Sequence, residues 1–143
     1  MNTGIFKANT GKSPEEFIKD LDRSAQKSGF VVREVHDMKQ IFSEHGVCVS
    51  GDFNYYMVQV CNPKKAHNSI SKNPERGVLI PKFVMVFRGG DGDGNGNGKT
   101  EVRFLSYGQD FVGSLFGDDL NFQESLPESC ENIISIINEA LKN

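Results

Sequence analysis

The chain has no tryptophan, only three cysteines among its 143 residues, and no long apolar run. A membrane-spanning helix needs about 18 or more consecutive apolar residues, so we predict no membrane partner. Cys48, Cys61 and Cys130 are odd in number and far apart, which favours free thiols over a disulfide framework. The first residues lack the charged and apolar stretches of a signal peptide. We therefore expect a cytoplasmic protein.

An excess of basic residues is also missing. The chain carries 16 Lys and Arg against 19 Asp and Glu, a formal net charge of −3. Because a nucleic-acid-binding face needs concentrated positive charge, this composition argues against a nucleic-acid partner. The 37% hydrophobic and 24% charged residues are ordinary for a globular domain. We expect one domain over residues 1–143, with no cofactor, disulfide or metal needed for folding.

The spacing of apolar residues predicts four helices. Ser13 and Pro14 suit the cap and first turn of a helix, and Gly29 suits its end. The last helix is expected to begin in the Ser-Leu-Pro-Glu segment at 125–128 and to carry a broad isoleucine-rich stripe. Two shorter helices are predicted at residues 37–45 and 64–72. Residues 1–12 are expected to form an N-terminal arm.

Four segments are typical of strands, at residues 30–35, 53–61, 83–87 and 101–105. A run of Gly, Asp and Asn separates the last two and predicts a flexible hairpin loop over residues 89–100. Mixed helices and strands with a hairpin indicate an α+β fold. We expect a two-layer sandwich, a mainly antiparallel sheet with helices packed on one face. Residues 108–126 are predicted to form an apolar turn or short helix.

The glycine-rich loop contains a partial calcium-binding pattern. Asp91, Asp93 and Asn95 alternate as the first ligands of an EF-hand do. However, the twelfth position is Val102, where an EF-hand has a glutamate, and strands rather than helices flank the loop. The three residues are therefore candidate metal ligands only, and a loop without a specific metal is the alternative.

Cys61 is the candidate nucleophile. It lies at the end of a strand and just before a helix, and helix N-termini lower the pKa of a thiol. His67 can act as its base, and Tyr55 lies on the same strand as a third candidate catalytic residue. The alternative is that Cys61 is only a small buried residue at a strand end. Candidate ligand-binding residues are Asn62, Tyr56 and Tyr107.

Three short motifs resemble a known family. They are Lys27-Ser28-Gly29-Phe30, Cys61-Asn62-Pro63-Lys64-Lys65-Ala66 and Leu79-Ile80-Pro81. Together they are similar to the family called domain of unknown function 302, over about Phe17 to Tyr107. The resemblance implies a compact two-layer α/β domain, often a dimer, with no established activity. The chain departs from that family in Ile80 beside Lys82 and in a longer, more glycine-rich hairpin loop.

No catalytic set stands out, while the sheet and last helix carry wide apolar stripes. The first hypothesis is therefore a non-enzymatic binding or self-association module, a homodimer formed through its sheet or its C-terminal helix. The second is a thiol-based enzyme, or a redox or ligand sensor, that uses Cys61 near His67. The third is a small-molecule carrier in which residues 108–126 form a lid.

Overall fold

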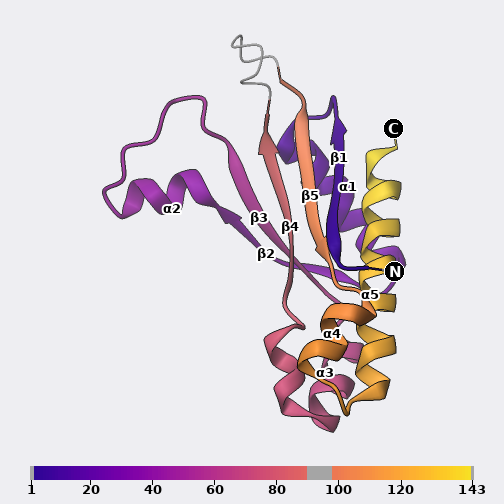
Figure 1. Ribbon diagram of the computed structural model, residues 1–143. Helices are drawn as coiled ribbons and strands as arrows, with labels where there is room; N and C mark the ends of the chain where they lie inside the picture. Colours follow the sequence, from indigo (N-terminus) through magenta and orange to yellow (C-terminus); the bar gives the residue numbers. More distant parts are fainter. Residues whose placement is uncertain (1, 90–97, 143) are drawn as a thin grey trace.

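The computed structural model describes residues 2–89 and 98–142 (Figure 1). The strands of this part are β1 (Gly4–Thr10), β2 (Val31–Asp37), β3 (Tyr55–Cys61), β4 (Lys82–Arg88) and β5 (Thr100–Ser106). The helices are α1 (Pro14–Lys27), α2 (Met38–Glu44), α3 (Pro63–Lys72), the 3-10 helix η1 (Pro74–Val78), α4 (Gln109–Leu115) and α5 (Leu120–Leu141).

The five strands form one sheet in the order β1-β5-β4-β3-β2, and every neighbouring pair is antiparallel. The predicted hairpin of β4 and β5 is present, with Val84 opposite Phe104 and Arg88 opposite Thr100. Helices α1 and α5 lie side by side against the sheet. The α+β fold with an antiparallel sheet is confirmed.

Strand β1 lies where the sequence predicts an N-terminal arm over residues 1–12, so that prediction is wrong for residues 4–10. Residues 4–10 instead pair with β5 along its whole length, from Gly4 opposite Ser106 to Thr10 opposite Thr100. The segment contains Gly, Asn and Lys, which are poor strand formers, so its local pattern is weak. Pairing with a strand about a hundred residues away in sequence stabilises it.

The core lies between the sheet and the two long helices. Strand β4 shows the underlying alternation: Val84 and Val86 are buried on the helix side, while Phe83, Met85 and Phe87 lie on the opposite face. Burying each such apolar side chain contributes roughly 1.5–3 kcal/mol. The largest wholly buried side chains in this cluster are Phe17 and Leu21 of α1, Phe104 of β5, and Ile133 and Ile137 of α5.

Helix α1 begins and ends as its sequence predicts. The Ser13 hydroxyl accepts a hydrogen bond from the Glu16 amide at 3.1 Å, and the Glu16 carboxylate accepts one from the Ser13 amide. The chain leaves the helix at Gly29, whose φ of +78° is a left-handed conformation that suits glycine.

Helix α5 begins earlier than predicted. Its cap is Asp119, whose side chain accepts from the Phe122 amide, and Pro127 lies inside the helix instead of in its first turn. A proline inside a helix costs about 3 kcal/mol, which is why the pattern indicated a start at 125–128. Here Pro127 is buried between Leu126 and Cys130, which are also buried, and their packing offsets that cost.

Helix α2 lies apart from the core (Figure 1). It belongs to the segment between β2 and β3, which extends outward from the sheet in Figure 1, and of its seven residues none is buried. Phe42 packs on Phe53 at 6.0 Å between ring centroids. In the described residues, no helix is long and apolar enough to cross a membrane.

Candidate functional site

A cavity of about 310 Å³ opens between α3 and α5, at the end of the sheet where β3 stops and β4 starts. Ligand-binding cavities of proteins start at about this size. We call it the α3–α5 cavity. It is lined by side chains of α3, of the first turns of α5 and of two strand ends: Cys61, Asn62, Lys65, Ala66, Asn68, Ser69, Lys72, Arg76, Ile80, Lys82, Asn121, Phe122, Ser125, Leu126, Glu128 and Ser129.

Among the described residues that line this cavity, Lys82 is the least accessible lysine. It is the first residue of β4 and shares the inward parity of Val84 and Val86, so only 9% of its surface is exposed. Its ammonium donates to the Ile80 carbonyl at 3.1 Å. Across residues 2–89 and 98–142 no carboxylate forms an ion pair with it. A buried lysine without an anionic partner is rare, because the charge loses its hydration.

Burial lowers the pKa of the Lys82 amine, whereas the nearby thiols of Cys130 and Cys61 act in the opposite direction. The same burial raises the pKa of the Cys130 thiol. The interior around Lys82 therefore favours neutral groups, and the amine carries its proton less readily than an exposed lysine does.

The rim of the cavity adds further positive charge. Lys65 and Lys72 of α3 line the cavity and are exposed. Glu128 of α5 is also exposed, and it is the one carboxylate among the described residues that line the cavity. Three lysines thus face one carboxylate. Ser125, Ser129 and the α3 cap Asn62 are among the residues that add hydroxyl and amide groups to the lining.

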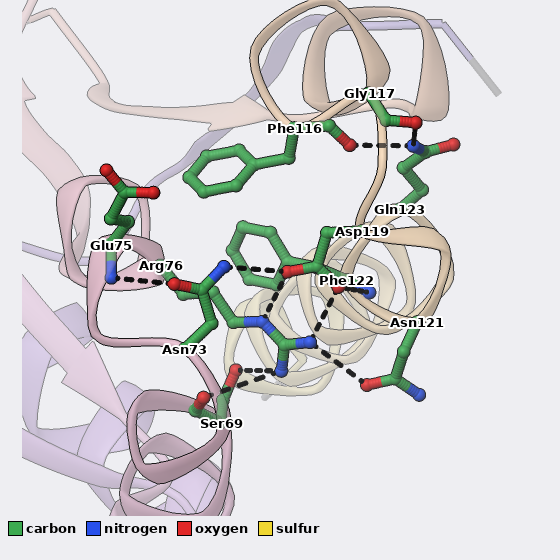
Figure 2. Close-up of polar contacts among 10 residues, drawn as sticks. All are labelled: Ser69, Asn73, Glu75, Arg76, Phe116, Gly117, Asp119, Asn121, Phe122 and Gln123. Atoms are coloured by element: carbon green, nitrogen blue, oxygen red, sulfur yellow. Dashed lines mark hydrogen bonds and ion pairs between the residues drawn. The ribbon is translucent and has the colours of Figure 1, made fainter.

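Arg76 forms one wall and is neutralised by Asp119 (Figure 2). Its Nε and one terminal nitrogen donate to the two Asp119 oxygens at 2.8 and 2.7 Å, and its other terminal nitrogen donates to the Ser69 hydroxyl at 3.1 Å. The guanidinium also lies over the Phe122 ring, 5.0 Å from its centroid. These hydrogen bonds from Arg76 lower the pKa of the Asp119 carboxyl to about 2. Arg76 therefore joins η1 to the start of α5 and is not free to bind a ligand.

The family model described as domain of unknown function DUF302 matches residues 6–143. The chain belongs to the DUF302 family. It is similar to a crystal structure described as an uncharacterized conserved DUF302 protein from Bacillus stearothermophilus. That similarity has a TM-score of 0.76 and 19% sequence identity, and covers 95% of this chain and 97% of the other. No curated protein matches the chain. At this identity the likeness shows the fold alone.

Two predicted site residues of this DUF302 domain reach the cavity. Cys61 lines it from the end of β3, and Asn62 lines it while capping α3, where its side chain accepts from the Lys65 amide at 3.2 Å. His67 does not join them: it is exposed on α3, lies 3.5 Å from the Ser71 hydroxyl, and is not among the described lining residues. Cys61 and His67 therefore do not share this cavity.

The three candidate tyrosines lie elsewhere. Tyr55 stacks on Phe87, with ring centroids 5.1 Å apart, at the far end of β3 from Cys61. The Tyr56 hydroxyl donates to the Glu15 carboxylate of α1 at 2.5 Å, and burial together with that carboxylate raises the Tyr56 pKa. Tyr107 stacks on Phe111 of α4 at 5.4 Å, and burial raises its pKa. These three residues do not form one site.

Residues 108–126 form α4 and the first turns of α5, and α4 packs against α5. The candidate metal ligands Asp91, Asp93 and Asn95 lie outside the described residues. Within the described ranges, no group of three or more His, Cys, Asp or Glu side chains is arranged to hold a metal ion.

Lys82, the residue that distinguishes this cavity, was not predicted as a site residue from the sequence. The sequence pattern indicates its position, since Lys82 has the same parity as Val84 and Val86 and is followed by five apolar residues. A lysine at an inward position of such a strand is unusual and can be found by counting parity back from the buried valines. The pairing of Arg76 with Asp119 spans 43 residues and has no local signal.

Proposed function

We propose that this DUF302 domain binds a small anionic molecule, with a carboxylate or phosphate group, in the α3–α5 cavity. The observation that carries the proposal is the buried amino group of Lys82, which pairs with no carboxylate within the described part of the chain. An anion entering the cavity supplies the missing partner. The exposed Lys65 and Lys72 attract it, although the chain as a whole is acidic.

The size and lining of the cavity restrict the ligand class. About 310 Å³ accommodates a metabolite rather than a peptide or nucleotide chain. The apolar part of the lining, Ala66, Ile80 and Leu126, suits a short carbon skeleton, and the serines and asparagines supply hydrogen bonds. The proposal agrees with the binding-module hypothesis but identifies a different site from the Cys61 and His67 pair.

Thermal unfolding with inorganic phosphate, pyruvate, lactate and succinate, at constant ionic strength, tests the proposal. A ligand present at ten times its Kd stabilises the folded state by about 1.4 kcal/mol. For a domain of this length that raises Tm by roughly 3–6 °C. The Lys82→Met variant should show no such rise for the anion that stabilises the wild type.

The chain offers a matched control pair on α3. Lys65 lines the cavity, whereas its neighbour Lys64 is exposed and does not line it in the described structure. Lys65→Met should weaken binding, and Lys64→Met should leave it unchanged. Equal effects of the two variants would indicate only a general charge effect, and no response to any of the four anions would refute the proposal.

We propose self-association through the open face of the sheet as a second function. The supporting observation is a row of half-buried apolar and aromatic side chains on the face opposite α1 and α5: Tyr55, Met57, Phe83, Met85 and Phe87. Beside them Ile5 is 62% and Leu105 46% exposed. A face with this much apolar surface is typical of an interface between subunits. By contrast, the apolar stripe of α5 already packs in the core, which leaves the sheet as the favoured surface.

Light scattering coupled to size-exclusion chromatography tests this second proposal. The wild type should elute with twice the chain mass, and Met85→Lys, at the centre of the row, should elute as a monomer. Ser43→Lys, a change on the separate helix α2, should leave the dimer intact. A wild type that is monomeric at high micromolar concentration would remove the proposal.

A further inference from the structure

We propose that Lys82 forms an imine with the carbonyl carbon of a small 2-oxo acid bound in the α3–α5 cavity. This inference rests on the proposed function and names its ligand class: a short acid whose carboxylate meets Lys65 and Lys72 and whose neighbouring carbonyl meets the amine of Lys82. It assigns the cavity a covalent chemistry that anion binding alone does not require.

The geometry of Lys82 favours a nucleophilic amine. Lys82 lines a cavity that is large enough for a small molecule, and only 9% of the residue is exposed. Among the described residues, its hydrogen bond is to the Ile80 carbonyl, and an amine can make further hydrogen bonds or bonds to a ligand. A carboxylate of the protein fixed beside the amine would hold it in its protonated, unreactive form, and among the described residues no carboxylate forms an ion pair with Lys82.

The lowered pKa of Lys82 also favours a nucleophilic amine. Only the neutral amine has a lone pair for attack, and burial lowers the pKa of Lys82 despite the opposing thiols of Cys130 and Cys61. Each unit by which a lysine pKa falls raises its neutral fraction at neutral pH about tenfold. Desolvation in an apolar pocket activates lysines in this way.

The covalent step needs no further reactant. The lone pair of Nζ attacks the carbonyl carbon, a carbon–nitrogen bond forms, and the carbonyl oxygen takes up a proton to give a carbinolamine. The oxygen then leaves as water with both protons of the original amine, and the carbon–nitrogen double bond forms. Glu128 and Ser129 line the same cavity and supply groups that can carry these protons.

A 2-oxo acid matches the charges better than a simple aldehyde does. Lys65 and Lys72 lie at the rim and give the carboxylate a place, so the carbonyl is directed inward to Lys82. A phosphate has no electrophilic carbon and can only bind. An experiment can therefore distinguish imine formation by a 2-oxo acid from simple binding of an anion.

Trapping with cyanoborohydride tests the inference on the intact chain. The folded protein is incubated at pH 7 with pyruvate and the reductant, and the product is analysed by intact mass and peptide mapping. One reduced pyruvyl adduct per chain is expected at Lys82, with trapping faster there than at the exposed Lys64. Equal rates at the two lysines, or no adduct at Lys82, would overturn the inference.

Two variants and one analogue separate the outcomes. Lys82→Arg keeps the positive charge without a nucleophilic amine, so it should still bind but not trap. Lactate has the carboxylate but no carbonyl. If lactate and pyruvate raise the wild-type Tm equally and no adduct forms, imine formation is wrong while anion binding stands. If neither raises Tm and no adduct forms, both proposals fail. Because the mapping is done on the wild type, the result does not depend on the variants folding.

Discussion

Replacing Asp119 by asparagine removes the negative charge that neutralises Arg76 at one wall of the α3–α5 cavity. The change is nearly isosteric, so packing around Phe122 is preserved. Asparagine can still accept one hydrogen bond, and it can still cap α5 through the Phe122 amide. The measured effect therefore reports the ion pair rather than the shape of the side chain.

The structure allows the size of the effect to be worked out. Arg76 and Asp119 side chains are 5% and 16% exposed, and the two contacts are 2.8 and 2.7 Å long. Removing one partner of a buried ion pair costs about 3–5 kcal/mol. Arg76 retains its contacts with Ser69 and Phe122, so we expect the lower end, about 3 kcal/mol. For a domain of this length the corresponding fall in Tm is roughly 6–12 °C.

The effect should depend on pH in a defined direction. The Asp119 pKa is lowered from 3.8 to about 2 in the folded protein. Its contribution to stability is therefore present above pH 3.8 and is lost as the pH falls through 2. The difference in unfolding free energy between wild type and Asp119→Asn should be constant from pH 7 to 5 and should shrink below pH 4.

Urea unfolding followed by far-UV circular dichroism is the assay, because the chain has no tryptophan to report by fluorescence. The exposed neighbour gives a matched control: Asp118→Asn should change the unfolding free energy by less than about 0.5 kcal/mol. A loss below about 1 kcal/mol for Asp119→Asn at pH 7, or a loss that does not shrink in acid, would refute the reasoning.

Two further predictions concern other parts of the fold. Lys82→Met should raise the urea midpoint at pH 7. As the pH rises toward 10.5, the stability of the wild type should increase relative to that of the variant, because the lowered pKa of the Lys82 amine means that folding favours its neutral form. Ser13→Ala should lower the unfolding free energy by about 1 kcal/mol through loss of the α1 cap, measured against Ser50→Ala in the loop before β3.

Local signals were sufficient for much of this fold. The cap at Ser13, the stop at Gly29 and the alternation in β4 are each properties of a few neighbouring residues, and the corresponding elements lie where the sequence places them. Strand β1 and the start of α5 were mispredicted, because β1 depends on pairing with β5 and the turns before Pro127 depend on Asp119 and on burial. Tertiary contacts overrode local preference in both cases.

The candidate site was predictable only in part. Cys61 and Asn62 were singled out from the junction of β3 and α3, and both line the cavity. The partner assigned to Cys61 was His67, because it is near in sequence; the helix instead directs Lys65, Ala66 and Ser69 to the cavity. The other wall comes from α5, about sixty residues later, and no pattern in one sequence links those segments.

Lys82 is expected to lower the stability of the empty protein and to raise that of the ligand-bound protein. Comparing the two states therefore tests whether Lys82 binds a ligand. A lysine kept for structure would hold an anionic partner, and its replacement would destabilise the fold. A lysine kept for binding lowers the stability of the protein without ligand, since its charge loses hydration on burial and no described carboxylate compensates for that loss. Lys82→Met should then be more stable than the wild type without ligand and less stable than the wild type once the anion is present. A variant that is less stable under both conditions would make Lys82 a structural residue and would move the search for a ligand to another surface.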